Sequence, residues 1–163
     1  MKDKIIIKKL DNIDNPYFDT ICDWNYEWWG KDEQYSYEQL KEHFKYSLNK
    51  WILLPQTFIA ISEEKRVVVG MYRINPSDRA LVRSDIYPLL SSVYVEKNHR
   101  SMWIWTKLME HAMETIKNLN IKKIYLYTDL DWFYEKFWWK YIWDVNTLDP
   151  TSPIDKLYIF ETK

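Results

Sequence analysis

The residues with the clearest potential for chemistry form a short polar turn between an apolar strand and an amphipathic helix. The segment runs from Val93 to Met109 and reads VYVEKNHRSMWIWTKLM. Backbone N–H groups that converge at a helix N-terminus, together with the helix dipole, bind phosphate well. Trp103 and Trp105 nevertheless stand where such a turn needs residues without a Cβ, for close approach to the anion or for a positive φ. The segment therefore predicts a phosphate site that two indoles obstruct.

The shortage of glycine extends over the whole chain. Only Gly30 and Gly70 are present, beside ten tryptophans, whereas ordinary usage of about 7% would give roughly eleven glycines in this length. This imbalance indicates that tryptophan stands at positions where glycine is expected.

Length and charge narrow the class of protein. The chain has 163 residues, which predicts a single domain over 1–163 with a real core. Its formal net charge of -1 argues against nucleic acid or a membrane surface as a partner. The lone Cys22 and the early charges of the N-terminus predict a cytoplasmic protein without disulfides. The scattered histidines predict no metal site, and a homodimer is left open.

Hydrophobic periodicity and turn residues predict an α/β fold. Strands are expected over 4–10, 57–61, 66–74, 89–95, 122–128, 139–143 and 156–161, and helices over 16–29, 37–48, 104–119 and 132–137. Gly30 is expected to stop the first helix, and Ser36 to open the second through a capping box with Gln39. A loop is expected over 149–153. One β-α-β crossover through 104–119 then joins a mixed, mostly antiparallel sheet flanked by helices.

With glycine at 103 and 105, the turn would read Arg-x-x-Gly-x-Gly, and the chain resembles the GNAT superfamily of acetyltransferases, which hold the pyrophosphate of acetyl-coenzyme A in that loop. Residues 133–139, FYEKFWW, resemble the family pattern Phe-Tyr-Glu-Lys-x-Gly-Phe/Trp, with Trp138 in the glycine position. The predicted order of elements is also that of the family. The resemblance implies a GNAT-like fold and an N-acetyltransferase that uses acetyl-coenzyme A.

The resemblance also implies roles for single residues. Tyr134 matches the tyrosine that protonates the leaving thiolate, and the strand before the loop is expected to bulge, so that the backbone of Ser92 to Val95 pairs with the pantetheine arm. The amine needs a base or a water chain, for which Asp85 and Glu96 are candidates, and backbone N–H groups would stabilise the oxyanion. Cofactor contacts are expected from Val93, Tyr94, Val95, Arg100, Ser101, Met102, Trp103, Ile104, Trp105 and Thr106.

The acceptor is expected to be a primary amine of a small molecule or a peptide. Trp24, Glu27 and Trp28 of the first helix are predicted to line its pocket, with burial of the indoles against the sheet as the equal alternative. The main alternative is a non-catalytic protein of the same fold, with tryptophans filling the cofactor cleft. An aromatic carbohydrate-binding module would place tryptophans on exposed sheet faces, and their clustering at predicted element ends and turns weighs against it.

Five tryptophans fall on glycine positions of the family, namely Trp103, Trp105, Trp132, Trp138 and Trp143. Trp132 and Trp143 are expected in turns. A one-way exchange suggests that one codon, most simply UGA, is decoded as glycine in the source organism. Trp24, Trp28, Trp29 and Trp139 are expected to be native, and Trp51 is left unassigned.

Overall fold

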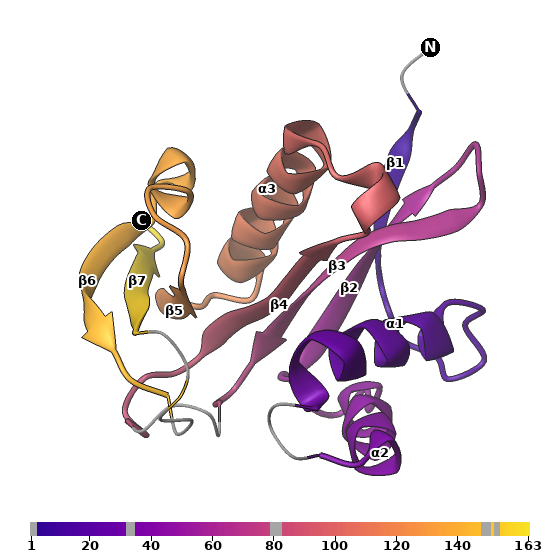
Figure 1. Cartoon of the computed structure of the whole chain (residues 1–163), viewed down its shortest axis with the longest axis horizontal. Helices are drawn as coiled ribbons and strands as arrows, with labels where there is room; N and C mark the ends of the chain where they lie inside the picture. Colours follow the sequence, from indigo (N-terminus) through magenta and orange to yellow (C-terminus); the bar gives the residue numbers. More distant parts are fainter. Residues whose placement is uncertain (1–2, 32–34, 79–82, 148–150, 152–153) are drawn as a thin grey trace. The chain divides into compact units, whose positions relative to one another are not determined.

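The structure is a computed structural model that describes residues 3–31, 35–78, 83–147, 151 and 154–163. Its elements are, in chain order, β1 (Ile5–Lys9), α1 (Phe18–Asn25), the π-helical turn η1 (Tyr26–Gly30), α2 (Tyr37–Ser47), β2 (Gln56–Ser62), β3 (Val67–Asn75), β4 (Leu89–Val95), the 3-10 turn η2 (Lys97–His99), α3 (Met102–Asn118), β5 (Lys123–Thr128), the 3-10 turn η3 (Tyr134–Phe137), β6 (Lys140–Val145) and β7 (Asp155–Glu161) (Figure 1). Of the loop predicted over 149–153, only Thr151 is described.

The strands follow the predicted mixed and mostly antiparallel arrangement. Their order is β1-β2-β3-β4-β5-β7-β6. The pairs β1–β2, β5–β7 and β6–β7 are antiparallel, while β4 and β5 are parallel, with Leu89 opposite Tyr125. The parallel pair follows from the predicted crossover, because α3 carries the chain from the end of β4 back to the start of β5. The predicted fold class is confirmed.

The chain divides into two compact units, and the single domain predicted over 1–163 stays a prediction. The first unit contains residues 1–73 and 92–108, and the second contains residues 74–91 and 109–163.

In the first unit, helices cover both faces of the sheet. Met71 of β3 belongs to a buried cluster with Ile21 of α1 and Phe44 of α2. A Cβ at its neighbour Gly70 would lie 3.0 Å from Leu108 of α3 and 2.9 Å from the Tyr94 carbonyl oxygen. Successive residues of a strand point to opposite faces. The helices α1 and α2 therefore pack on one face and the start of α3 on the other (Figure 1).

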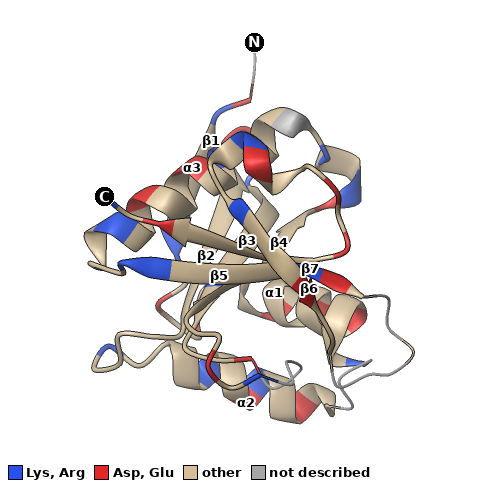
Figure 2. Cartoon of the chain, turned by 90° about the vertical axis from the view of Figure 1, so that its left-hand side faces the viewer, with Lys and Arg blue, Asp and Glu red and all other residues tan. Residues whose placement is uncertain are grey.

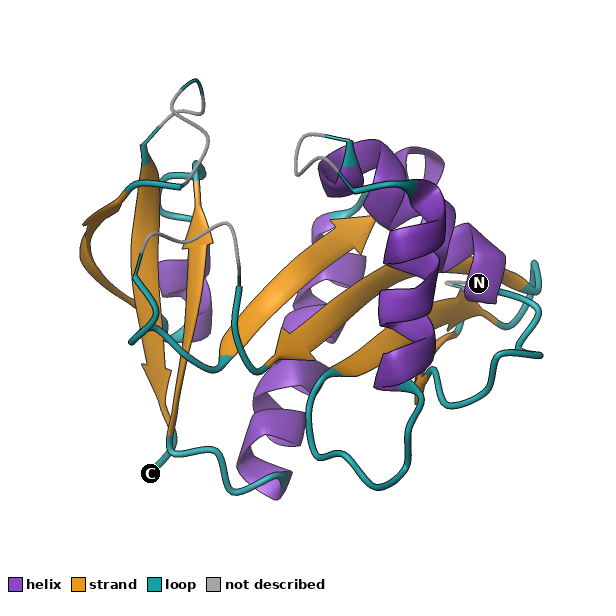
Figure 3. Ribbon diagram, turned by 90° about the horizontal axis from the view of Figure 1, so that it is seen from below, coloured by secondary structure: helices purple, strands orange, loops and turns teal. Residues whose placement is uncertain are grey.

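In the second unit, β5, β7 and β6 form a ribbon that packs on Ile86 and on the start of β4. Leu157 of β7, Val145 of β6, Leu89 and Ile86 share one buried cluster. The turn η3, the short helix beside these strands in Figure 3, contacts β6. The Tyr134 ring of η3 lies 6.1 Å from the ring of Tyr158 on β7. The register of β6 on β7 shifts between Tyr141 and Trp143.

Most predicted boundaries differ from the structure by one or two residues, and the ends of the first helix differ for a clear physical reason. The first helix begins at Phe18 rather than Pro16, because Asn15 bonds the Tyr17 N–H through its side chain and the Phe18 N–H through its carbonyl, and so closes a turn. It continues as the π-helical η1, and Gly30 has no positive φ, so it is not a left-handed cap. A Cβ there would lie 3.0 Å from Leu40 of α2, which makes Gly30 a close-packing site.

The other differences concern tryptophans. The helix predicted over 132–137 is a 3-10 turn that starts at Tyr134, since Trp132 has φ 58 and cannot continue a right-handed helix. The strand predicted over 139–143 runs from Lys140 to Val145. Trp143 therefore lies in β6 beside the register shift, and its predicted turn position is wrong.

Candidate active site

The predicted phosphate loop connects β4 to α3 through a single 3-10 turn. The Glu96 carboxylate accepts hydrogen bonds from the Asn98 backbone N–H (2.8 Å) and from His99 Nδ1 (2.9 Å). Partial burial raises the pKa of Glu96, but these hydrogen bonds outweigh that effect and lower it. Glu96 thus holds the turn in shape, and its lowered pKa makes it a weaker base than an unpaired carboxylate, as is also the case for Asp85.

The helix α3 starts directly after this loop. The Ser101 carbonyl oxygen accepts the Trp105 N–H at 3.3 Å, and Ser101 Oγ lies 3.4 Å from the Ile104 nitrogen. Ile104 is buried, so a contact with the cofactor can involve only its backbone, while Thr106 is half-buried. Met102 is helical, and its side chain is not described. A helix of 17 residues that begins here offers N–H groups and positive potential to a phosphate.

Trp103 and Trp105 lie inside the first turns of α3 rather than in the loop. Both are half-buried, and Lys107 Nζ lies 5.7 Å from the Trp103 ring. Neither residue has a positive φ, so that part of the prediction is wrong. The remaining argument for glycine is space. Cationic side chains and a helix N-terminus suit a pyrophosphate, but two indoles in the first turns do not leave the bare backbone that it needs.

Trp132 and Trp138 do have left-handed backbones. Their φ values are 58 and 68, and their side chains are 77% and 81% exposed. Trp138 is the C-cap of η3. A left-handed backbone costs an L-residue roughly 1–2 kcal/mol and suits glycine. Trp139, by contrast, is only 2% exposed and packs against Phe160 and Tyr134, as a native core residue does.

The end of β4 has the irregularity that a bulge needs. Ser92 has φ 49 in the middle of the strand. Beyond it, Val93 is half-buried, Tyr94 and Val95 are buried, and the Val69 carbonyl oxygen accepts the Glu96 N–H at 2.9 Å. A left-handed residue within a strand supports the predicted bulge. Backbone contact with the pantetheine arm stays a prediction.

Tyr134 lies in the second unit, within an aromatic cluster. It is 6% exposed, and its ring lies 5.2 Å from Phe133, 6.4 Å from Trp139 and 6.1 Å from Tyr158. Burial raises the pKa of the Tyr134 phenol, and the charge of Asp129 adds to the rise. The hydroxyl therefore keeps its proton at neutral pH, as a general acid must before it acts.

Asp85, the other predicted catalytic residue, is exposed and paired with Arg83. Arg83 Nε donates to Asp85 Oδ1 at 2.9 Å, and the second guanidinium nitrogen donates to Oδ2 at 2.5 Å. These hydrogen bonds hold the pKa of the Asp85 carboxyl below its ordinary value. A lowered pKa makes the carboxylate a weaker base.

The predicted acceptor residues occupy different surroundings. Trp24 is partly buried against the core of the first unit, with its ring 4.9 Å from Tyr94. Glu27 is exposed and pairs with Lys31 at 2.8 Å. The Trp28 ring lies 5.6 Å from Tyr94, and the cations of Arg100 and Lys97 lie 5.6 and 5.5 Å from its centre. The sequence did not indicate Lys97 or the contact of Trp28 with the two cations, because these residues lie far apart in the chain and no pattern connects them.

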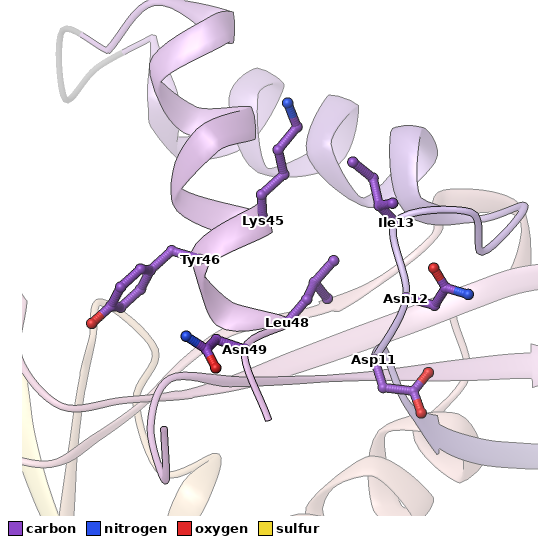
Figure 4. Close-up of a pocket in the computed structure, with 7 residues that line it drawn as sticks. All are labelled: Asp11, Asn12, Ile13, Lys45, Tyr46, Leu48 and Asn49. Carbon is purple, nitrogen blue, oxygen red and sulfur yellow. The ribbon is translucent and has the colours of Figure 1, made fainter. Parts of the chain in front are cut away.

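Two open pockets occur among the described residues. The first, of about 410 Å³, lies between the loop after β1 and the end of α2 (Figure 4) and contains none of the predicted site residues. The second, of about 330 Å³, lies in the second unit and is lined by Arg83, Trp143, Asp144, Val145 and Asn146. Arg83 lies 5.2 Å from the Trp143 ring. Arg83, the partner of Asp85, thus lines the second pocket.

No helix in the described ranges is long and apolar enough to cross a membrane. A group of three or more His, Cys, Asp or Glu side chains suited to a metal is likewise not found there. Burial raises the pKa of the Cys22 thiol to about 12, which keeps it from acting as a nucleophile. On the face drawn in Figure 2, acidic and basic segments are interspersed along α2, where Lys45 pairs with Glu42.

Comparison with known proteins identifies the family. The profile of the acetyltransferase (GNAT) family matches residues 18–137, and the chain belongs to this family. It is therefore an acetyltransferase of the kind that uses acetyl-coenzyme A as donor. Among curated proteins, none matches the chain significantly.

Solved structures confirm the fold. An aminoglycoside 6'-N-acetyltransferase complexed with coenzyme A has a TM-score of 0.71 at 18% identity, with 96% of each chain covered. An acetyltransferase from Streptococcus agalactiae has a TM-score of 0.65 at 21% identity, covering 97% of this chain and 98% of that one. An aminoglycoside 6'-acetyltransferase type Ii has a TM-score of 0.67 at 19% identity, with 96% of each chain covered.

Proposed function

We propose that this protein acetylates a primary amine of a small molecule or a peptide. The observation that carries the proposal is the start of α3, which follows a one-turn loop bearing the exposed cations Lys97 and Arg100. A pyrophosphate fits that combination of N–H groups, dipole and cations. A cytoplasmic location and a homodimer stay predictions.

The proposed chemistry is direct attack of the amine on the thioester. Tyr134 supplies a proton from its buried hydroxyl, which the raised pKa keeps in place until the leaving group needs it. Asp85 is the proposed base that receives a proton from the amine, and its pairing with Arg83 keeps it ionised to low pH. Trp24 and Glu27 are the proposed acceptor contacts. Backbone N–H groups at the end of β4 are proposed to stabilise the oxyanion.

We further propose that Trp103, Trp105, Trp132, Trp138 and Trp143 are glycines in the source organism, through a UGA codon read as glycine. The left-handed backbones of Trp132 and Trp138 and their large exposure support the exchange at two of these positions. The first turns of α3 support it at 103 and 105 through the space that a pyrophosphate requires. Peptide mass spectrometry of the natural protein tests it: residue masses of glycine are expected, and indole masses at 103 and 105 would contradict the proposal.

One observation favours a second function. The two half-buried indoles at the start of α3 would obstruct the cofactor if they are real, and the protein would then be a non-catalytic member of the fold. Only the catalytic function requires that glycine at both positions, 103 and 105, permits acetyl transfer.

The experiment is an acetylation screen with the full chain carrying Trp103→Gly and Trp105→Gly. Aminoglycosides lead the panel because two of the similar structures are aminoglycoside acetyltransferases. Polyamines, amino acids and peptides with free N-termini complete it. Acetyl-coenzyme A consumption that depends on one amine class is expected. Failure of every amine, with the cofactor bound, would leave binding as the function.

A further inference from the structure

Trp28 lies where η1 meets the phosphate loop, and its ring carries two cations. The Arg100 guanidinium lies 5.6 Å from the ring centre and Lys97 Nζ lies 5.5 Å from it. Arg100 also lies 5.9 Å from the Tyr94 ring and donates from Nε to the Val95 carbonyl oxygen at 3.2 Å. A single indole thus underlies both exposed cations of the loop.

Among the described residues, Lys97 and Arg100 have no carboxylate partner, so their contact with Trp28 matters more. Within the described ranges, neither Lys97 nor Arg100 forms a salt bridge. The neighbouring carboxylates are engaged elsewhere, Glu27 with Lys31 and Glu96 with His99. A carboxylate would neutralise the cations, whereas the face of an aromatic ring holds a cation and leaves its charge in place. The loop therefore keeps two positioned positive charges next to the start of α3.

We propose that Trp28 is a positioning residue of the cofactor loop, which orders Lys97 and Arg100 so that they face the pyrophosphate of acetyl-coenzyme A. This inference rests on the proposed function and gives Trp28 a role other than the predicted contact with the acceptor. The indole acts through the two cations and does not itself touch the reacting atoms.

The size of the effect follows from the two contacts. An exposed cation–π pair is worth about 0.5–1 kcal/mol, or about two- to fivefold in an equilibrium constant. Loss of both contacts should therefore weaken acetyl-coenzyme A binding about five- to thirtyfold. The KM of the amine should change less than about twofold, because the cations face the cofactor.

The test compares Trp28→Leu and Trp28→Phe in the full chain that carries glycine at 103 and 105. Leucine keeps an apolar side chain without a π face, and phenylalanine keeps a smaller face, so it should restore part of the loss. The KM values of acetyl-coenzyme A and of the amine are measured separately, and calorimetry gives the Kd of coenzyme A. In a chain that also carries Lys97→Met and Arg100→Met, Trp28→Leu should add less than about twofold.

The outcomes separate this inference from the proposed function. A selective loss of cofactor affinity that disappears without the two cations supports it. A rise in the amine KM alone, or equal losses with and without the cations, overturns it. If the glycine-bearing parent itself fails to bind coenzyme A, the proposed function falls and the inference falls with it. If the parent binds coenzyme A and Trp28→Leu binds it with the same affinity, only this inference is overturned and the proposed function stands.

Discussion

Replacing Trp138 by glycine and by alanine tests the left-handed backbone that marks this position. Both variants remove the same indole, which is 81% exposed, so their difference isolates the backbone. At φ 68 and ψ 15, alanine keeps a strain of roughly 1–2 kcal/mol, while glycine adds about 0.5–1 kcal/mol of chain entropy. The glycine variant should therefore be the more stable by about 1 kcal/mol, or about 2–4 °C in Tm for a chain of this size.

The matched control is the same pair of substitutions at Trp143. This residue lies in β6 without a positive φ, so alanine should exceed glycine by about 0.5–1 kcal/mol. Urea unfolding of the four variants, followed by circular dichroism, measures both differences. Equal stability of the two variants at 138, or an advantage for alanine there, would refute the left-handed assignment and the support it gives to glycine at that codon.

The remaining predictions concern the catalytic residues and pH. Tyr134→Phe should lower kcat at least about 100-fold. The control Tyr158→Phe loses a 2.9 Å hydrogen bond to Glu135, so it should cost about 1 kcal/mol of stability and leave kcat within about twofold. Equal kcat values for the two variants would exclude Tyr134 as the acid. If Asp85 is the base, Asp85→Asn should lower kcat/KM for the amine about 100-fold. Arg83→Gln should then move the acidic limb of the pH profile to higher pH, because Arg83 lowers the pKa of Asp85. If neither variant changes these values, Glu96 becomes the candidate base. Burial and Asp129 raise the pKa of Asp155 to about 6, so the stability it contributes is present below its ordinary 3.8 and is lost as pH rises through 6. Asp155→Asn should thus stabilise the fold at pH 8 by about 1 kcal/mol, allowing for partial exposure, and not at pH 4, which thermal unfolding at the two pH values would check.

Local patterns predicted those parts of the fold that local contacts determine. The start of α2 was predictable because the capping box joins residues three apart: Ser36 Oγ accepts the Gln39 N–H at 3.1 Å, and Gln39 returns a bond to the Ser36 N–H at 2.9 Å. The β4–α3–β5 crossover was predictable because apolar spacing distinguishes the strands from the helix. Trp138, which the family's pattern marked as a glycine position, has a left-handed backbone.

Other features depend on contacts that the sequence does not display. Gly30 ends the π-helical turn of the first helix and lies against Leu40, which belongs to the next helix and is not indicated by the local sequence. Trp143 was misplaced because a register shift in β6 involves its partner strand β7. The contact of Trp28 with Arg100 joins positions far apart in the chain, and no periodicity announces it. Residue types at the site were thus predictable, while their partners required the structure.

The most direct test of the central claim is calorimetric titration of acetyl-coenzyme A into two forms of this chain. One carries Trp103→Gly and Trp105→Gly, and the other keeps both tryptophans. The account predicts that the glycine protein binds at least about tenfold more tightly, a difference of about 1.4 kcal/mol or more, because the start of α3 becomes open to the pyrophosphate. Equal affinities, or no binding by the glycine protein, would contradict it.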